Sequence, residues 1–245
     1  IEDEDSLSER LNANRAVKPL DAAVIRLPHI SNFTDFMPLE QHELLGVRYV
    51  QRARELGRPD LVILPGTKNT MEDLLWLRQN GLEAATLKLA HAGTPILGVC
   101  GGYQMLGQTL DDPQGTESGR PMALSGLGLL PTRTVFDAQK RRMQVRAAAQ
   151  GELFGGASLT GYEIHNGRTE VGGAPFCMLE DGTPEGCVNR NVFGTYLHGL
   201  FDSCELTGAL VRMLCARKGI SPTQTKLMSM ADYRQQQFDL LADGV

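Results

Sequence analysis

Short runs of aliphatic residues, each followed by a turn-forming residue, constrain the fold of this chain more than any other feature. In the clearest example, residues 61–64 are all aliphatic and run directly into Pro65 and Gly66. Runs of this length, bounded by glycine or proline, are typical of buried strands. The runs that share the pattern, the second of them weakly, are residues 22–27, 47–50, 61–64, 95–99 and 192–197.

Segments with helical periodicity separate these runs. They occupy residues 71–79, 82–92, 103–108 and 203–218. Strands that alternate with helices predict an α/β fold with a mainly parallel sheet flanked by helices on both faces. Such sheets carry their sites at the carboxyl ends of the strands. We therefore expect Pro65-Gly66 and Cys100, which follow two of the runs, to be neighbours in space.

The second half of the chain has a different character. Residues 126–130, 143–147 and 161–164 resemble strands joined by polar connections, which predicts some antiparallel strands in this half. Residues 111–120 are polar and rich in turn formers, so we expect a surface loop there.

The two ends of the chain differ from its centre. The chain begins with Ile1 and an acidic stretch, so residues 1–18 are interpreted as a tail or linker from the upstream part of a longer protein. A processed N-terminus or a tag remnant is the alternative. Residues 19–219 are expected to form the main domain, and residues 220–245 a helical C-terminal extension.

Composition narrows the class of protein. The formal net charge of −5 gives no support to nucleic-acid binding, and no apolar run approaches the roughly 20 residues that span a bilayer. The five cysteines are odd in number and form no CxxC pair, so neither a disulfide framework nor a metal site is predicted. We expect a cytoplasmic protein that binds neither nucleic acid nor membranes.

The segment from Leu97 to Gln104 carries the strongest chemical signal. Cys100 lies among small residues, after an apolar strand and before a helix, which is the layout of a nucleophile elbow. The helix that follows favours the thiolate form of the cysteine, and the amide of Gly101 would point toward a developing oxyanion. A buried structural cysteine in a tight turn is the alternative that this motif alone leaves open.

A reactive cysteine needs a base that is usually distant in sequence but close in the fold. Of the five histidines, His165 and His198 lie downstream of Cys100 at the end of a strand-like run. A lone histidine at such a position is more often structural than catalytic, but the presence of Cys100 reverses that preference. We therefore expect Cys100 to be the nucleophile and His198 its base.

The motif Gly98-x-Cys100-x-Gly102-x-Gln104, with a late strand-borne His198, resembles the class I glutamine amidotransferases. This resemblance covers about residues 20–218 and implies a flavodoxin-like fold. It also implies that the loop containing Gly66 supplies the second oxyanion amide. Gln104 would help to hold the substrate glutamine.

Three further stretches, residues 30–36, 64–70 and 161–169, resemble the corrinoid amide synthase branch, most of all the C-terminal part of the cobyric acid synthases. The resemblance implies an upstream synthetase domain of the same chain that uses ATP and magnesium, whereas this domain needs no cofactor. It further implies that ammonia released here amidates carboxylates of an adenosylated cobyrinic acid diamide.

One position departs from the wider family. Most class I amidotransferases carry a glutamate two residues after the histidine, and Leu200 stands there in this chain. The corrinoid branch generally lacks this acid, so the departure supports the branch assignment. Asp35, Glu163 or a backbone carbonyl remain as alternatives for the group that orients His198.

Weaker signals concern the substrate pocket. Four arginines lie between nucleophile and base, and Arg142 is the one we favour as a partner for the glutamine α-carboxylate, although a solvated basic surface is the simpler interpretation. Tyr162 and His165 are predicted to line the glutamine site, with a structural role about equally well supported.

Competing functions remain open at this stage. Within the same branch they are the glutaminase of cobyrinic acid a,c-diamide synthase and that of a cell-wall isoglutaminyl synthase. Proteases and chaperone-like redox sensors also carry elbow cysteines, but would not be expected to have Gln104 or the His198 motif. A degenerate module that binds a partner without catalysis is the non-enzymatic alternative.

Overall fold

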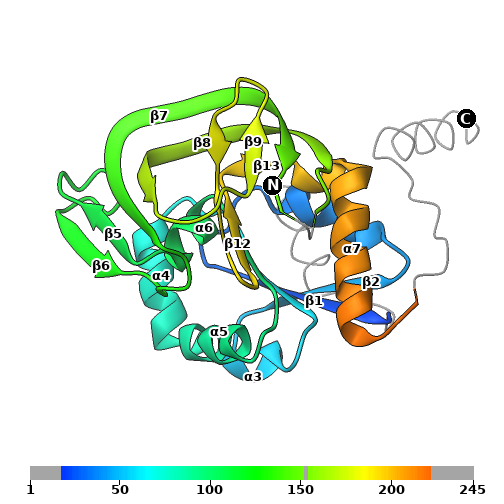
Figure 1. Cartoon of the computed structure of the whole chain (residues 1–245). Coiled ribbons are helices and arrows are strands. Elements are labelled where there is room, and N and C mark those ends of the chain that lie inside the picture. The colour runs from blue at the N-terminus through cyan, green and yellow to red at the C-terminus, as the bar shows by residue number, and fades with distance from the viewer. Residues whose placement is uncertain (1–17, 152–153, 222–245) are drawn as a thin grey trace, which may run out of the picture.

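The computed structural model describes residues 18–151 and 154–221, and a six-stranded sheet lies at its centre (Figure 1). The strand order is β11-β12-β4-β3-β1-β2, and all neighbouring pairs are parallel except β11 with β12. The strands are β1 (Leu20–Ile25), β2 (Leu45–Val50), β3 (Leu61–Leu64), β4 (Ile96–Val99), β11 (Cys187–Asn189) and β12 (Val192–Thr195). The predicted parallel sheet is confirmed, including its weakest strand.

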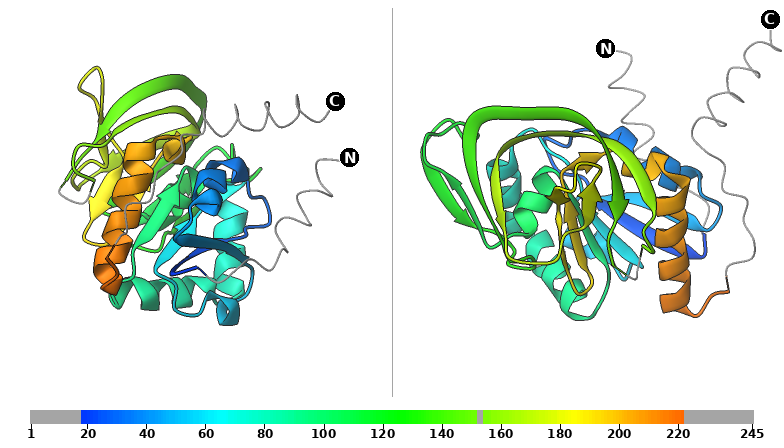
Figure 2. Two further views of the ribbon diagram at one scale, coloured as in Figure 1. Left: turned by 90° about the vertical axis from the view of Figure 1, so that its right-hand side faces the viewer. Right: turned by 45° about the horizontal axis from the view of Figure 1, so that its top comes forward.

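Helices cover both faces of this sheet, as predicted (Figures 1 and 2). Alternate residues of a strand point to opposite faces, so Val24 packs in a core with Phe36 and Leu210, while Ile25 packs in another with Leu74. The helices are η1 (Phe33–Phe36), α2 (Met37–Gln41), α3 (Ala53–Leu56), α4 (Thr70–Gln79), α5 (Leu82–His91), α6 (Gly101–Leu106), η2 (Leu200–Asp202) and α7 (Cys204–Lys218).

A second, largely antiparallel sheet arches over one side of the molecule (Figure 2). Its longest strands, β7 and β8, pair with each other along most of their length and form the arch. The strands are β5 (Thr109–Asp112), β6 (Met122–Ser125), β7 (Thr132–Ala149), β8 (Ser158–Val171), β9 (Cys177–Leu179), β10 (Pro184–Glu185) and β13 (Leu197–His198). The arch carries β8 across the carboxyl end of β4, where the Cys100 thiol donates a 3.3 Å hydrogen bond to the carbonyl oxygen of Ile164.

The prediction of a strand at residues 126–130 is wrong. This segment wraps around the end of α6, where the amides of Leu127 and Leu130 donate to the carbonyl oxygens of Met105 and Leu106. Its hydrogen bonds thus go to a helix terminus and not to a strand, although Leu127 and Leu130 are buried. The predicted loop at 111–120 begins two residues later, because β5 extends to Asp112.

The predicted tail at residues 1–18 and the predicted helical extension at 220–245 lie almost entirely outside the described residues. Within the described part of the chain, no helix combines the length and apolar character needed to cross a bilayer.

Candidate active site

Cys100 occupies a sharp turn between β4 and α6. Its φ of 51° and ψ of −111° are rare for a residue with a side chain, and such strain is held only where the surrounding structure enforces it. The small neighbours make the turn possible: a Cβ on Gly102 would lie 2.0 Å from the carbonyl oxygen of Leu64. Close packing of α6 against the end of β3 therefore requires glycine here, and it holds the thiol above the sheet.

His198, at the end of β13, reaches Cys100 from the other sheet. The two side chains line the same cavity, and the imidazole is 1% exposed. The structure thus brings together the predicted nucleophile and base, which are distant in sequence.

Asp35, in η1, orients the imidazole. Its Oδ2 lies 2.6 Å from Nδ1 of His198, and its Oδ1 accepts a 3.1 Å hydrogen bond from the amide of Gly199. A carboxylate at Nδ1 favours the tautomer that is protonated on this nitrogen and leaves Nε2 for proton transfer. Of the alternatives that the sequence left open, the geometry selects Asp35, whereas Glu163 binds Nε2 of His165 at 2.7 Å.

The electrostatics of the pair follow from these contacts. Burial lowers the pKa of His198, but the hydrogen bond to Asp35 and the proximity of Cys100 outweigh it and raise the pKa from 6.5 to about 9. His198 is therefore held as an imidazolium at neutral pH. A cationic imidazole beside a cysteine is the arrangement that generates a reactive thiolate.

Two residues flank the His198 ring. Tyr162 stacks on it with ring centroids 5.2 Å apart, and Nδ2 of Asn32 lies 3.0 Å from Nδ1 and 3.2 Å from Nε2. Tyr162 had been predicted for this region, but Asn32 had not. The usable signal for Asn32 was its place in the turn-rich stretch after β1, because sites gather at the carboxyl ends of parallel strands.

The two predicted oxyanion donors lie on neighbouring segments. Gly101 is the first residue of α6, a position whose amide has no intrahelical partner, and a Cβ on it would lie 2.5 Å from Cγ2 of Thr67. Gly66, next to Thr67, lies so close to His198 that its own Cβ would be 3.2 Å from Cε1 of the ring. The loop after β3 is thus packed between α6 and His198.

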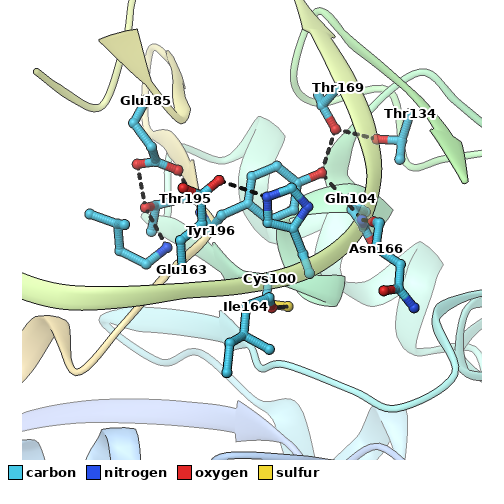
Figure 3. Close-up of polar contacts among 12 residues, drawn as sticks. Cys100, Gln104, Thr134, Glu163, Ile164, Asn166, Thr169, Glu185, Thr195 and Tyr196 are labelled. Atoms are coloured by element: carbon cyan, nitrogen blue, oxygen red, sulfur yellow. Dashed lines mark hydrogen bonds and ion pairs between the residues drawn. The ribbon is translucent and has the colours of Figure 1, made fainter. Parts of the chain in front are cut away.

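Gln104 is fixed at the base of the site (Figure 3). Its side-chain amide donates to the carbonyl oxygen of Asn166 at 3.1 Å and to the hydroxyl of Tyr196 at 3.2 Å, and it accepts from Thr70 at 3.0 Å. Both donor hydrogens are therefore used within the protein. Gln104 lines the cavity beside Cys100, and its place there is set by Asn166 in β8, by Tyr196 just after β12 and by Thr70.

His165 belongs to the wall behind Gln104. Its ring stacks on Tyr196 with centroids 3.6 Å apart, and its Nε2 binds the carboxylate of Glu163. Glu185 completes this buried cluster by accepting 2.7 Å hydrogen bonds from Thr195 and from the amide of Tyr196.

A cavity of about 290 Å³ opens above Cys100. The described residues that line it are Ser31, Asn32, Thr67, Lys68, Thr70, Cys100, Gln104, Glu117, Phe136, Ile164, His165, Asn166 and His198. The structure places the predicted residues Gln104 and His165 in this wall. Arg142 is exposed on β7 opposite Ile164 and is not among the lining residues. Lys68 and Glu117, which were not predicted as site residues, do line the cavity.

The comparison with known families decides the assignment, because residues 21–206 match the CobB/CobQ-like glutamine amidotransferase domain. The chain belongs to this family. Among curated proteins it is 44% identical over 259 residues to a cobyric acid synthase of Ruminiclostridium cellulolyticum and 44% identical over 260 residues to one of Salmonella typhimurium. All of the chain is covered, but only 50% and 51% of those proteins, so the chain spans about half of their length.

Solved structures support the fold of this amidotransferase family member. PurLQS from Thermotoga maritima matches with a TM-score of 0.61 and 19% identity over 81% of this chain and 100% of that one. A structure described as a glutamine amidotransferase matches with a TM-score of 0.57 and 17% identity, over 81% of this chain and 99% of that one. At these identities the likeness concerns the fold alone, and it confirms the predicted class I architecture.

Proposed function

We propose that this domain hydrolyses glutamine through a thioester on Cys100 and so supplies ammonia to a synthetase. The observation that carries the proposal is the arrangement of Cys100, His198 and Asp35, which join a strained elbow, an imidazolium and a buried carboxylate in one site. Each component has a role in nucleophilic catalysis, and family membership supplies glutamine as the substrate.

The first half of the reaction forms the thioester. In the resting pair the proton of Cys100 already lies on His198, and the sulfur attacks as a thiolate on the side-chain carbonyl carbon of glutamine. The amides of Gly66 and Gly101 stabilise the oxyanion. The imidazolium then donates its proton to the leaving nitrogen, so that the C–N bond breaks and ammonia departs.

The second half restores the enzyme. His198 removes a proton from water, which attacks the thioester carbonyl carbon. The C–S bond breaks, the sulfur leaves as a thiolate beside the His198 imidazolium that now holds the proton from water, and glutamate departs. The net change is glutamine plus water to glutamate plus ammonia. Asp35 acts throughout by holding the ring orientation and stabilising the imidazolium.

The wider reaction rests on the relatives. The name of these relatives, cobyric acid synthase, and their twofold length support a second half that uses ATP and magnesium to activate carboxylates. We place the amidated carboxylates on an adenosylated cobyrinic acid diamide, a step of cobalamin biosynthesis. A cytoplasmic location and a linker at residues 1–18 belong to the same proposal.

The decisive experiment is covalent labelling with the glutamine analogue diazo-oxo-norleucine, followed by peptide mapping of the full-length protein. We expect modification at Cys100 alone, prevented by L-glutamine. The His198→Ala variant should lose the labelling, because general acid–base catalysis of this kind contributes roughly 10²- to 10⁴-fold in rate. A folded protein whose Cys100 resists the reagent would show that the site does not process glutamine.

A further inference from the structure

The cavity above Cys100 contains one full positive and one full negative charge besides its histidines. Of the lining residues, Lys68 is the single Lys or Arg, and Glu117 is the single Asp or Glu. Free glutamine also carries one charge of each sign on its α-carbon. That carbon is separated by three carbon–carbon bonds from the carbonyl group that Cys100 attacks.

Glu117 is held firmly in place at the cavity wall. Its Oε1 accepts a 2.6 Å hydrogen bond from the amide of Thr70, at the start of α4. Behind it, the buried carboxylate of Asp112 accepts hydrogen bonds from the amides of Thr116, Glu117 and Ser118, which fixes the loop. The position of the Glu117 side chain is thus set from two sides before any ligand binds.

No cation balances Glu117 among the described residues. Its hydrogen-bond partner is the neutral amide of Thr70. Burial raises the pKa of Glu117, and the nearby carboxylates Asp112 and Asp73 add to this rise, while hydrogen bonding to Thr70 opposes it. A partly buried carboxylate surrounded by like charges is stabilised by a cation in contact with it. The cavity side of Glu117 therefore favours an ammonium group.

Lys68 offers the complementary charge. It follows Thr67 in the loop after β3, its side chain is exposed, and none of the described side chains forms an ion pair with it. The backbone of this loop is anchored, since the amide of Lys68 donates to the carbonyl oxygen of His29 at 3.0 Å.

A path of contacts links Glu117 to the helix that follows the reactive cysteine. Gln104 lies one helical turn after Cys100, its Oε1 accepts from the Thr70 hydroxyl, and the amide of the same threonine binds Glu117. Glu117 is thus joined through Thr70 to Gln104, in the helix that follows Cys100.

We propose that Glu117 binds the α-ammonium group and Lys68 the α-carboxylate of the substrate, so that these two residues select a free α-amino acid amide. The inference rests on the proposed glutaminase function and names the recognition elements of that same site. It also gives Lys68 the role that the sequence analysis had favoured for Arg142, which lies exposed on β7 outside the cavity lining.

The test measures how three amides protect Cys100 of the full-length protein from iodoacetamide, a small alkylating agent that needs no glutamine site. L-Glutamine carries both α-groups, glutaramic acid lacks the α-ammonium group, and γ-aminobutyramide lacks the α-carboxylate. The variants are Glu117→Gln, which keeps an oxygen acceptor for the Thr70 amide, and Lys68→Met.

We expect Glu117→Gln to weaken protection by L-glutamine and γ-aminobutyramide roughly 10- to 100-fold, the range for a hydrogen bond to a charged group, and to leave glutaramic acid unchanged. Lys68→Met should weaken the protection of Cys100 by L-glutamine and by glutaramic acid, and leave protection by γ-aminobutyramide unchanged. If a variant weakened protection by all three ligands equally, or by none of them, the inference would be overturned and the glutaminase function would still stand. If L-glutamine fails to protect the unmodified protein, the proposed function itself falls.

Discussion

Asp35 and His198 are 163 residues apart in the chain, yet Oδ2 of Asp35 lies 2.6 Å from Nδ1 of His198. This contact accounts for the departure at Leu200, where the wider family carries a glutamate. Leu200 is 2% exposed and packs in an apolar core cluster with Phe36. A carboxylate at that position would be buried among apolar groups, and η1 supplies one to the imidazole from another direction.

The first prediction concerns the role of Asp35. Asp35→Asn should lower kcat/KM for glutamine hydrolysis by about 10- to 100-fold, because a hydrogen bond to a charged group contributes about 1.5–3 kcal/mol. Steady-state glutamate release measures the effect. Asp202→Asn, an exposed neighbour at the end of η2, is the matched control and should change the rate less than about twofold. Equal rates for both variants would remove Asp35 from the mechanism.

The second prediction concerns pH. The pKa of His198 is raised from 6.5 to about 9, so hydrolysis should decline as pH rises through about 9 and the imidazolium is lost. Asp35→Asn should move this alkaline limb to lower pH, because Asp35 raises the pKa. The stabilisation from the raised pKa is fully present below pH 6.5 and is lost through about pH 9. The unfolding free energies of the unmodified protein and of Asp35→Asn should therefore converge between pH 6.5 and about 9, as urea titrations at several pH values would show.

A third prediction tests the packing of the elbow. A Cβ on Gly102 would meet the backbone of Leu64 at 2.0 Å, so Gly102→Ala should destabilise the protein by about 3 kcal/mol or more and abolish labelling of Cys100. Gly46→Ala is the control, since the nearest atom to its added Cβ is 3.5 Å away, and it should change stability by less than about 1 kcal/mol. Thermal unfolding measures both. A Gly102→Ala protein as stable as the control would contradict the packing argument.

A fourth prediction concerns Tyr196. Its hydroxyl contacts both Gln104 and Thr169 in the buried wall of the site, so Tyr196→Phe should cost about 1–3 kcal/mol by leaving polar groups without a partner. It should also weaken glutamine protection of Cys100. Tyr49→Phe removes a hydroxyl that donates to Glu40 outside the site and should leave protection unchanged. The prediction fails if L-glutamine protects Cys100 equally well in the two variants.

The fifth prediction concerns the loop that holds Glu117. Burial raises the pKa of Asp112, but the hydrogen bonds from residues 116–118 outweigh it and hold the pKa below its ordinary value of 3.8. A lowered pKa stabilises the fold above the unfolded value, and this contribution disappears as pH falls through the folded value. Asp112→Asn should therefore cost about 1.5–3 kcal/mol at pH 7 and much less below pH 3.

The measurement for Asp112 is urea unfolding at both pH values, with the exposed neighbour Asp111→Asn as control. Asp112→Asn should also weaken L-glutamine protection of Cys100, because the loop positions Glu117. If the stability loss of Asp112→Asn were the same at both pH values, the ionised form of Asp112 would not be what strengthens these hydrogen bonds.

Much of this protein could be predicted from its sequence because the relevant forces are local. The aliphatic runs of β3 and β4 are buried on both faces, so their composition alone marks them as parallel strands. The elbow at Cys100 depends on small neighbours next to it in the chain, which the sequence displays directly. The same local reasoning failed at residues 126–130, since an apolar segment looks alike whether its amides bond to a strand or to the end of α6.

The sequence by itself determined the nucleophile motif, the alternation of strands and helices, and the family to which the chain belongs. Only the tertiary structure decided which carboxylate reaches His198 and which charges face the substrate cavity. Asp35, Lys68 and Glu117 lie in three separate segments whose approach to Cys100 depends on the order of β4, β3 and β1 and on the loop behind Asp112. Hydrophobic periodicity specifies which face of each element is buried, whereas side chains distant in sequence meet only when the whole core is packed.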